Sequence, residues 1–331
     1  MIEKNEISEV GLGIKISVRN FVSSKPDVPE LLEAGRENKI NLLDIVNVLG
    51  ISRTENRVGR ALDQLNCRED FFVITKGGID WQSEEGFQPA GDPETIRKNV
   101  EKSLQKLRLE AIDCFQVYWP DKSVPLDETV GQLAQLKSEG LIRNSGVANF
   151  SLPQLKKALR GGDLDFIQLP YNPDRRGAGD DFLAFCRQNR LKTIGYEGLC
   201  HGFFTDEFLA GELELENSFQ GSTDYIDRNY MLFKNLTKKI AEYLAEKNID
   251  TSFTSTIIKW NLLQEGIDHE IVVGYEPEHV KKIAEAREVP LEAKEAEEIN
   301  KLIHNELSGK LPAETISKVF PDHSQREAEN K

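Results

Sequence analysis

Three residues that can move a proton stand at the ends of three predicted strands. They are Asp44, the last residue of 40–44, Lys76, the last residue of 71–76, and Tyr118, the last residue of 112–118. Because the carboxyl ends of parallel strands meet at one edge of a sheet, we expect these side chains to lie close together. A lysine beside a phenol favours the phenolate. A desolvated lysine can also act as a base or as an imine-forming nucleophile. The residues therefore indicate a site for proton transfer or for carbonyl chemistry.

The elements that would position these residues follow an alternating β and α pattern. Strands are predicted at residues 10–16, 40–44, 71–76, 112–118, 144–148, 166–169, 193–196 and 270–273. Helical periodicity occurs between them, for example at residues 94–107, 127–139, 152–159 and 180–189. Such alternation is typical of a parallel sheet with helical crossovers. About eight units over ~300 residues favour an α/β fold of one (β/α)₈ TIM-type barrel, and no GxGxxG follows the first strand.

Two segments do not follow this alternating β and α pattern. Residues 207–232 are acidic and polar, and they predict either a long excursion over the barrel mouth or a mobile surface loop. Residues 1–316 are assigned to the barrel with its C-terminal extension. Residues 317–331 are polar and are predicted to be a frayed tail.

Composition excludes several classes of protein. The 331 residues have a formal net charge of −14 and a pI near 5.0, which argues against nucleic acid and anionic membranes as partners. The mean hydropathy of −0.47 and the lack of a long apolar run predict neither a transmembrane helix nor a signal peptide. The cysteines and histidines show no metal-ligand spacing, so we expect no metal site. Scattered cysteines favour reduced thiols in a cytoplasmic protein.

Several ordered blocks of the chain resemble the aldo-keto reductases. The resemblance runs from about Val10 to Glu285 and includes NLLDIVNVLG at 41–50, TKG at 75–77, QVYWPD at 116–121, GLIRNSGVANF at 140–150 and YEGLCHG at 196–202. The family fold is a (β/α)₈ barrel, which agrees with the alternating pattern. The resemblance also implies carbonyl reduction with a nicotinamide dinucleotide, in which a tyrosine protonates the substrate oxygen.

The catalytic set of the family is incomplete in this chain. Asp44 and Lys76 match the aspartate and the lysine that assist the tyrosine. Leu49 stands at the tyrosine position and Tyr118 at the usual histidine position. Losing a positioned general acid typically lowers the rate by ~10²–10⁴-fold. We therefore expect this chain not to reduce carbonyl compounds in the standard way.

Several functions remain open on this sequence. The barrel would bind a small ligand at its mouth, with Asp44 and Lys76 kept as a structural ion pair. Alternatively, Tyr118 helped by Lys76 would be the proton donor of an active NAD(P)H-dependent oxidoreductase, or Lys76 would serve as a base or nucleophile in a non-redox reaction. A regulatory or interaction subunit with a protein partner is a further possibility, because a fold does not fix a function.

The resemblance also places a cofactor groove. Asn149, Gln168 and Tyr196 match residues that hold and stack the nicotinamide, while Ala148 replaces a serine. The other cofactor positions are Leu199 and Gly202 in the pyrophosphate loop, and Gly274 and His279 at the adenosine end.

Acidic residues occupy the adenosine end of that groove. Glu276 and Glu278 would repel a 2′-phosphate, although Lys281 or Lys282 could compensate. The sequence therefore predicts weakened NADP(H) binding, with NAD(H) or no bound nucleotide as alternatives. Two other basic features, Arg175-Arg176 and His201, are predicted to be an ordinary surface pair and a solvated loop histidine.

Overall fold

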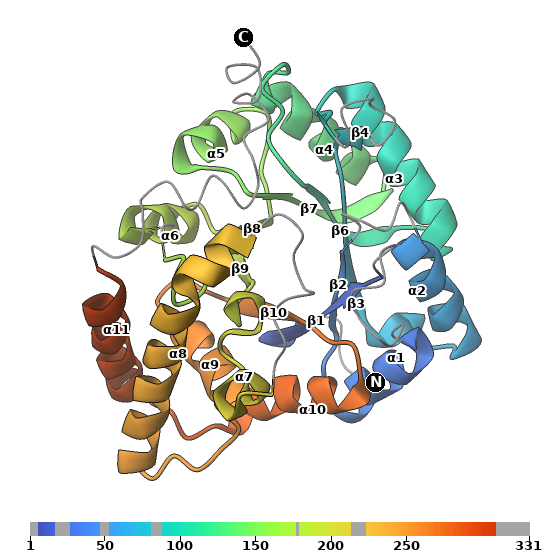
Figure 1. Cartoon of the computed structure of the whole chain (residues 1–331). Coiled ribbons are helices and arrows are strands. Elements are labelled where there is room, and N and C mark those ends of the chain that lie inside the picture. Colours follow the sequence, from blue (N-terminus) through green and yellow to red (C-terminus); the bar gives the residue numbers. More distant parts are fainter. Residues whose placement is uncertain are drawn as a thin grey trace.

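A computed structural model describes residues 6–16, 27–46, 53–80, 88–176, 179–212 and 223–308. Eight parallel strands close into a barrel in the order β1-β10-β9-β8-β7-β6-β3-β2. Helices surround these strands (Figure 1). The (β/α)₈ barrel expected from the alternating pattern is therefore confirmed. Leu49 and the predicted tail at 317–331 lie outside the described residues.

The barrel strands agree closely with those expected from the sequence. They are β1 (Val10–Lys15), β2 (Leu42–Val46), β3 (Phe72–Gly77), β6 (Ile112–Val117), β7 (Ile142–Ala148), β8 (Phe166–Pro170), β9 (Lys192–Tyr196) and β10 (His269–Val273). Their ends differ from the predicted ends by at most two residues. A two-stranded antiparallel sheet of β4 (Ile79–Asp80) and β5 (Gln88–Pro89) was not predicted, because two-residue strands carry no periodicity.

The helices form the outer layer of the molecule. They are α1 (Val28–Glu37), α2 (Arg53–Gln64), α3 (Pro93–Leu107), α4 (Leu126–Ser138), α5 (Leu152–Ala158), α6 (Gly179–Gln188), α7 (Asp206–Ala210), α8 (Thr223–Glu246), α9 (Phe253–Leu262), α10 (Pro277–Glu285) and α11 (Ala293–Leu307). Helices α7 and α8 include parts of segment 207–232. The alternative of a surface loop throughout that segment is therefore wrong for residues 207–210 and 223–232, which are helical.

Local sequence explains where several helices begin and end. The Asp92 side chain accepts a hydrogen bond from the Thr95 amide at 2.9 Å, and Pro93 occupies the first turn of α3. Ser151 and Gln154 form a reciprocal capping box at the start of α5. These caps satisfy amide groups that a helix cannot pair internally.

Side chains inside the barrel change from apolar to polar along five of the eight strands. An inner apolar cluster contains Leu42, Phe72, Ile74, Cys114, Phe166, Ile194 and Ile271. Two residues later on five of the strands stand Asp44, Lys76, Gln116, Gln168 and Tyr196. Because side chains of a strand alternate between its two faces, these polar groups also face the interior, one layer closer to the carboxyl ends. The strand period thus gathers them at the barrel mouth.

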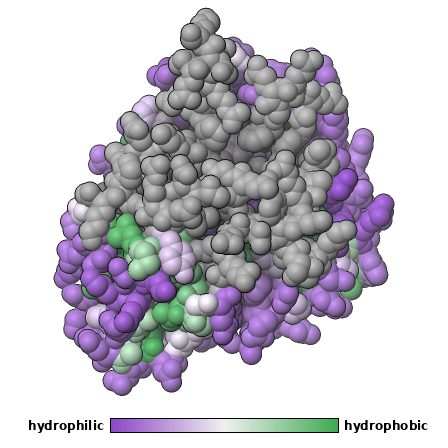
Figure 2. Space-filling model, in the orientation of Figure 1, coloured by the Kyte–Doolittle hydropathy of each residue, from purple (hydrophilic) through white to green (hydrophobic). Residues whose placement is uncertain are grey.

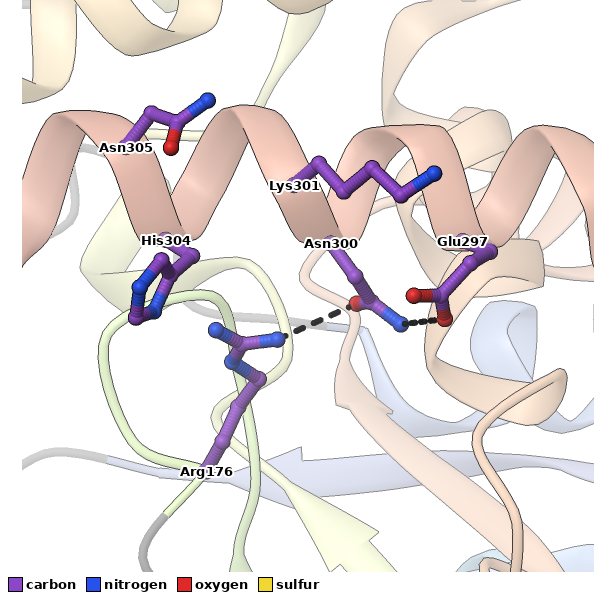
Figure 3. Close-up of a pocket in the computed structure, with 6 residues that line it drawn as sticks. All are labelled: Arg176, Glu297, Asn300, Lys301, His304 and Asn305. Atoms are coloured by element: carbon purple, nitrogen blue, oxygen red, sulfur yellow. Dashed lines mark hydrogen bonds between the residues drawn. The ribbon is translucent and has the colours of Figure 1, made fainter.

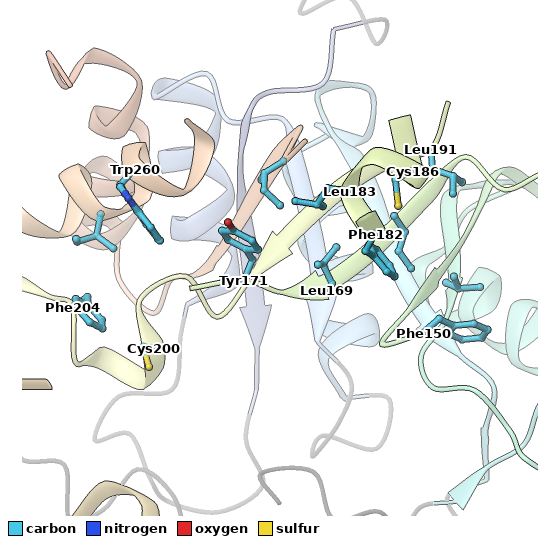
Figure 4. Packing of buried hydrophobic residues seen from close by; sticks show 14 of the residues in the cluster. Phe150, Leu169, Tyr171, Phe182, Leu183, Cys186, Leu191, Cys200, Phe204 and Trp260 are labelled. Carbon is cyan, nitrogen blue, oxygen red and sulfur yellow. The ribbon is translucent and has the colours of Figure 1, made fainter. Parts of the chain in front are cut away.

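The outward faces of the strands pack against the helices. Figure 4 shows part of this packing, where Tyr171 and Trp260 lie near the segment that carries Cys200 and Phe204. The rings of Tyr171 and Trp260 are stacked with centroids 6.4 Å apart. This apolar layer supports the backbone that leads from β9 to α7.

The surface is mainly hydrophilic around the periphery of the face shown in Figure 2. Apolar colour gathers on the side where α7 and α8 lie, and these helices carry the exposed Leu209 and Met231. Within the described residues, no helix combines the length and apolar character needed to cross a bilayer. All four cysteines are buried, and none of them forms a disulfide.

Candidate functional site at the barrel mouth

Asp44 and Lys76 form an ion pair at the carboxyl ends of the neighbouring strands β2 and β3. The Lys76 ammonium donates to Asp44 Oδ1, and Gln168 Nε2 donates to Asp44 Oδ2 at 3.1 Å. The exposed fractions of Asp44 and Lys76 are only 2% and 8%. Removing either partner would leave a buried charge uncompensated. The structure thus brings together the two charged residues that the sequence singled out.

Tyr118 follows β6 and lies beside this pair. Lys76 Nζ is 6.0 Å from the centroid of the Tyr118 ring, and the ring is packed against Trp119 with centroids 3.8 Å apart. Burial, together with the negative charges of Asp44 and Glu197, raises the pKa of the Tyr118 phenol well above its ordinary value. Tyr118 is therefore placed near a cation, but its environment favours the neutral phenol.

Asn149 connects Tyr118 to Tyr196 across the mouth. Its Nδ2 donates to the Tyr118 carbonyl at 3.0 Å, and its Oδ1 accepts from the Tyr196 hydroxyl at 2.6 Å. Asn149 has a left-handed backbone with φ of 64°, a conformation that asparagine tolerates better than most residues. Both ends of its side-chain amide are therefore occupied.

Two buried glutamines retain unpaired polar atoms inside the barrel. Gln168 Oε1 and both amide atoms of Gln116 have no hydrogen-bond partner within the described ranges. Gln116 pairs in register with Lys76 and is completely buried. Buried amides are normally hydrogen-bonded, so these unpaired atoms are suited to an ordered water or to a donor that reaches this inner layer.

A second group of charged residues lies at the mouth, on β1 and in the loops after β8 and β9. The sequence predicted Arg175 only as a surface residue and did not indicate Lys15 or Glu197. Arg175 is 5% exposed, and its Nη1 donates to Glu197 Oε2 at 3.0 Å. Lys15 ends β1, two residues after the inward-facing Gly13, and its charge interacts with that of Glu197. Burial lowers the pKa of Lys15 and raises that of Glu197, while their mutual attraction opposes both changes.

These positions correct two sequence expectations. Arg175 is a buried partner of Glu197 and not part of an ordinary surface pair. His201 is half-buried, and burial with the nearby positive charges of Arg175 and Lys15 lowers its pKa to about 4. The two-residue period of β1 could have identified Lys15. The Arg175–Glu197 contact joins separate loops and leaves no local signal.

The loop after β9 contains two residues assigned to the cofactor groove. Leu199 packs against both large apolar clusters. Gly202 has a φ of 97°, which other residues rarely adopt. Glycine is therefore required at 202 for the chain to turn toward α7.

The other two assigned residues, Gly274 and His279, lie beyond β10. The Gly274 amide donates to the Gly13 carbonyl at 3.2 Å, and a methyl group at 274 would come within 2.8 Å of Leu12. His279 in α10 accepts a hydrogen bond from the Tyr275 amide at 3.3 Å. Both residues thus have structural contacts that hold the start of α10 against the barrel.

Charge at the start of α10 is predominantly acidic. Glu276 is the N-terminal cap and Glu278 lies in the first turn. Lys282 donates to Glu207 at 2.7 Å and lies 3.2 Å from Asp206. Lys282 is therefore neutralised by the acidic residues of α7. It does not offset the negative charges of Glu276 and Glu278, a compensation that the sequence had left open.

Two surface cavities lie away from these groups. One of about 490 Å³ is lined by Arg176, Glu297, Asn300, Lys301, His304 and Asn305. Figure 3 shows Arg176 pointing toward Asn300 of α11, with Nη1 to Oδ1 at 3.2 Å. The other, of about 560 Å³, is lined by residues that include Phe166 and Lys192 at strand starts, so it lies at the opposite end of the barrel. Neither cavity contains Asp44, Lys76 or Tyr118.

Gln168 and Tyr196 at the mouth are suited to hold a nicotinamide. The unpaired Gln168 Oε1 could accept a hydrogen bond from a carboxamide, and the Tyr196 ring offers a stacking surface. Each end of the Asn149 amide already has one partner, which leaves one N–H and one oxygen lone pair for a further hydrogen bond. Among the residues that the structure describes, no group of three or more histidine, cysteine or acidic side chains could hold a metal ion.

Comparisons with known proteins agree with this architecture. The profile of the aldo/keto reductase family matches residues 10–304. Aldo-keto reductase YhdN of Bacillus subtilis is 28% identical over 324 residues, which cover 94% of this chain and 95% of that protein. The NADH-specific methylglyoxal reductase of Escherichia coli is 36% identical over 200 residues, covering 56% and 61%. The glycerol dehydrogenase AKR11B4 of Gluconobacter oxydans superposes with a TM-score of 0.78 at 25% identity, covering 93% and 94%. The chain belongs to the aldo/keto reductase family.

Proposed function

We propose that this protein binds a small ligand at the barrel mouth together with a weakly held nicotinamide dinucleotide that lacks a 2′-phosphate. We further propose that it does not perform standard carbonyl reduction. The observation that carries this proposal is the ion pair between Lys76 and Asp44 beside Tyr118, which stands at the usual histidine position. Lys76 is bound by Asp44, and the pKa of the nearby Tyr118 phenol is raised. A general acid works best when its pKa lies near the operating pH, so this phenol is a poor donor.

The preference for NAD(H) rests on charge at the start of α10. Glu278 would repel a 2′-phosphate, and Lys282 is already bound by Glu207. The relative from Escherichia coli, named as NADH-specific, is consistent with this preference. When bound, the dinucleotide would supply hydride chemistry. Gln168 and Tyr196 would hold its nicotinamide, while Asp44 would keep Lys76 and Gln168 in place.

A second candidate is supported by the proximity of Lys76 to Tyr118. At 6.0 Å from the ring centroid, a modest movement would bring the ammonium nearer to the phenol. Tyr118 would then donate the proton in an active NAD(P)H-dependent reductase. The two candidates share the ligand site and differ in whether Tyr118 contributes to turnover.

The ligand site can be tested by calorimetric titration with NADH and NADPH. We expect NADH to bind more tightly than NADPH. Tyr196→Ala should weaken NADH by roughly tenfold through loss of stacking. Tyr243→Ala, which changes a tyrosine on α8 that interacts with α11, is the matched control and should leave binding unchanged. Absence of NADH binding at millimolar concentration, or equal loss in both variants, would contradict the proposal.

A further inference from the structure

Glu270 is an acidic residue buried behind the barrel wall. It precedes the inward-facing Ile271 in β10, so its side chain points outward, toward the helical layer. Asn261 of α9 approaches the same place, and both residues have no exposed surface. Neither residue belongs to the mouth described above. Glu270 is therefore a buried acid outside the mouth.

The head group of Glu270 lies directly against the backbone of residues 195–198. A methyl group added to Gly195 would stand 2.1 Å from Glu270 Oε2. A methyl group added to Gly198 would stand 2.2 Å from Glu270 Oε1 and 2.4 Å from Asn261 Nδ2. Such distances are far inside van der Waals contact, so glycine is required at both positions. The two glycines thus create the space that the carboxyl group fills.

The surroundings of Glu270 favour an uncharged carboxyl group. No well-formed hydrogen bond reaches either oxygen, or either amide atom of Asn261, within the described residues. Burial raises the pKa of Glu270 well above its ordinary value, and contact with the Gly198 backbone opposes this only in part. A buried carboxylate without a cation would be far more costly than the neutral acid.

The segment that Glu270 contacts also carries mouth residues. Tyr196 and Glu197 lie between the two glycines, with Tyr196 bonded to Asn149 and Glu197 bonded to Arg175. A shift of this backbone would therefore move the stacking ring and the charged pair together.

We propose that Glu270 is a positioning residue: its head group, beside Asn261, fixes the backbone of residues 195–198 and thereby places Tyr196 at the mouth. That Glu270 affects NADH affinity through Tyr196 rests on the proposed function. That Glu270 fixes the backbone of residues 195–198 does not depend on it. Two measurements on the same variants separate these claims.

The first measurement is hydrogen exchange of the full chain, followed by mass spectrometry of peptides covering residues 195–204. The second is NADH titration. Glu270→Gln keeps the shape of the neutral acid and should change both readouts by less than twofold. Glu270→Ala empties the space and should accelerate exchange in residues 195–204 and weaken NADH, each by about tenfold.

The matched control is Glu55→Gln, a change at another buried acid. Glu55 accepts from Thr75 at 2.8 Å and from Ser103 at 2.6 Å, and it lies 3.7 Å from Lys106. This substitution should reduce overall stability but leave the exchange of residues 195–204 relative to the rest of the barrel unchanged.

Two results would overturn the proposal. One is a Glu270→Gln variant as perturbed as Glu270→Ala, and the other is unchanged exchange at residues 195–204 in Glu270→Ala. If Glu270→Ala does not fold, Gly198→Ala, whose methyl group displaces the carboxyl group, is measured in its place with the same expectation. If the wild-type protein binds no NADH, the proposed function fails, while the exchange data still decide the role of Glu270.

Discussion

Asp44 and Lys76 are joined by a buried ion pair across two adjacent strands, with Gln168 donating to the second carboxylate oxygen. The pair lies in the first polar layer above the apolar interior of the barrel. Because both charges are buried, each compensates the other, whatever their part in chemistry. The ion pair also explains why the positive charge of Lys76 is directed at Asp44 and not at Tyr118.

Breaking this pair should destabilise the protein strongly. Lys76→Met or Asp44→Asn each leaves one buried group without its partner, and we expect a loss of about 3–5 kcal/mol in the free energy of unfolding. The double variant should lose less than the sum of the two, because the groups share one interaction. Urea denaturation measures these values. Lys98→Ala, which breaks the exposed pair with Glu94, is the control and should have almost no effect. Additive losses would argue against a coupled pair.

Reversing the charge at Glu278 should improve binding of the phosphorylated dinucleotide. Glu278→Arg replaces repulsion by attraction in the first turn of α10, and we expect NADPH affinity to rise by about tenfold while NADH affinity stays constant. Calorimetry with both nucleotides tests this. Glu285→Arg makes the same charge change at the other end of the helix and should alter neither affinity. An equal gain from both variants would indicate a general charge effect.

The low pKa of His201 predicts a specific loss of stability in acid. The folded protein binds this proton only near pH 4, whereas the unfolded chain binds it near pH 6.5. Protonation therefore favours unfolding as the pH falls from about 6.5 to 4, with a total cost of up to roughly 3 kcal/mol. His201→Asn tolerates the local φ of 59° and should flatten this dependence.

Urea denaturation at several pH values between 7 and 4.5 would check the role of His201. His304→Asn, at an exposed position on α11, serves as the control and should retain the wild-type slope. The account of His201 is wrong if its removal leaves the acid-induced loss unchanged.

The sequence predicted the barrel because its strands carry a strong local signal. In β2, β3 and β8, polar residues follow an apolar start, and helices such as α3 and α5 begin at capping residues. The two-residue period of the strands brought Asp44, Lys76 and Gln168 to one site. Segment 207–232 misled the prediction of a loop because its acidic and polar composition gives little sign of the helices α7 and α8.

Long-range contacts account for what the sequence did not predict. Arg175 meets Glu197 only after two loops fold over the mouth, so its burial has no local pattern. Lys282 carries a favourable charge in the sequence, but its neutralisation by α7 depends on the packing of two separate helices. In the sequence, Glu270 is one polar residue within a strand. Its contact with residues 195–198 depends on the register of β9 and β10.

The central claim concerns turnover, and steady-state reduction of a panel of aldehydes and ketones with NADH tests it most directly. Wild type, Tyr118→Phe and Leu49→Tyr are compared under the same conditions. The account predicts slow turnover that Tyr118→Phe leaves within twofold and that Leu49→Tyr increases. Ordinary turnover that falls by ~10²-fold or more in Tyr118→Phe would contradict it, because that loss is the signature of a working general acid.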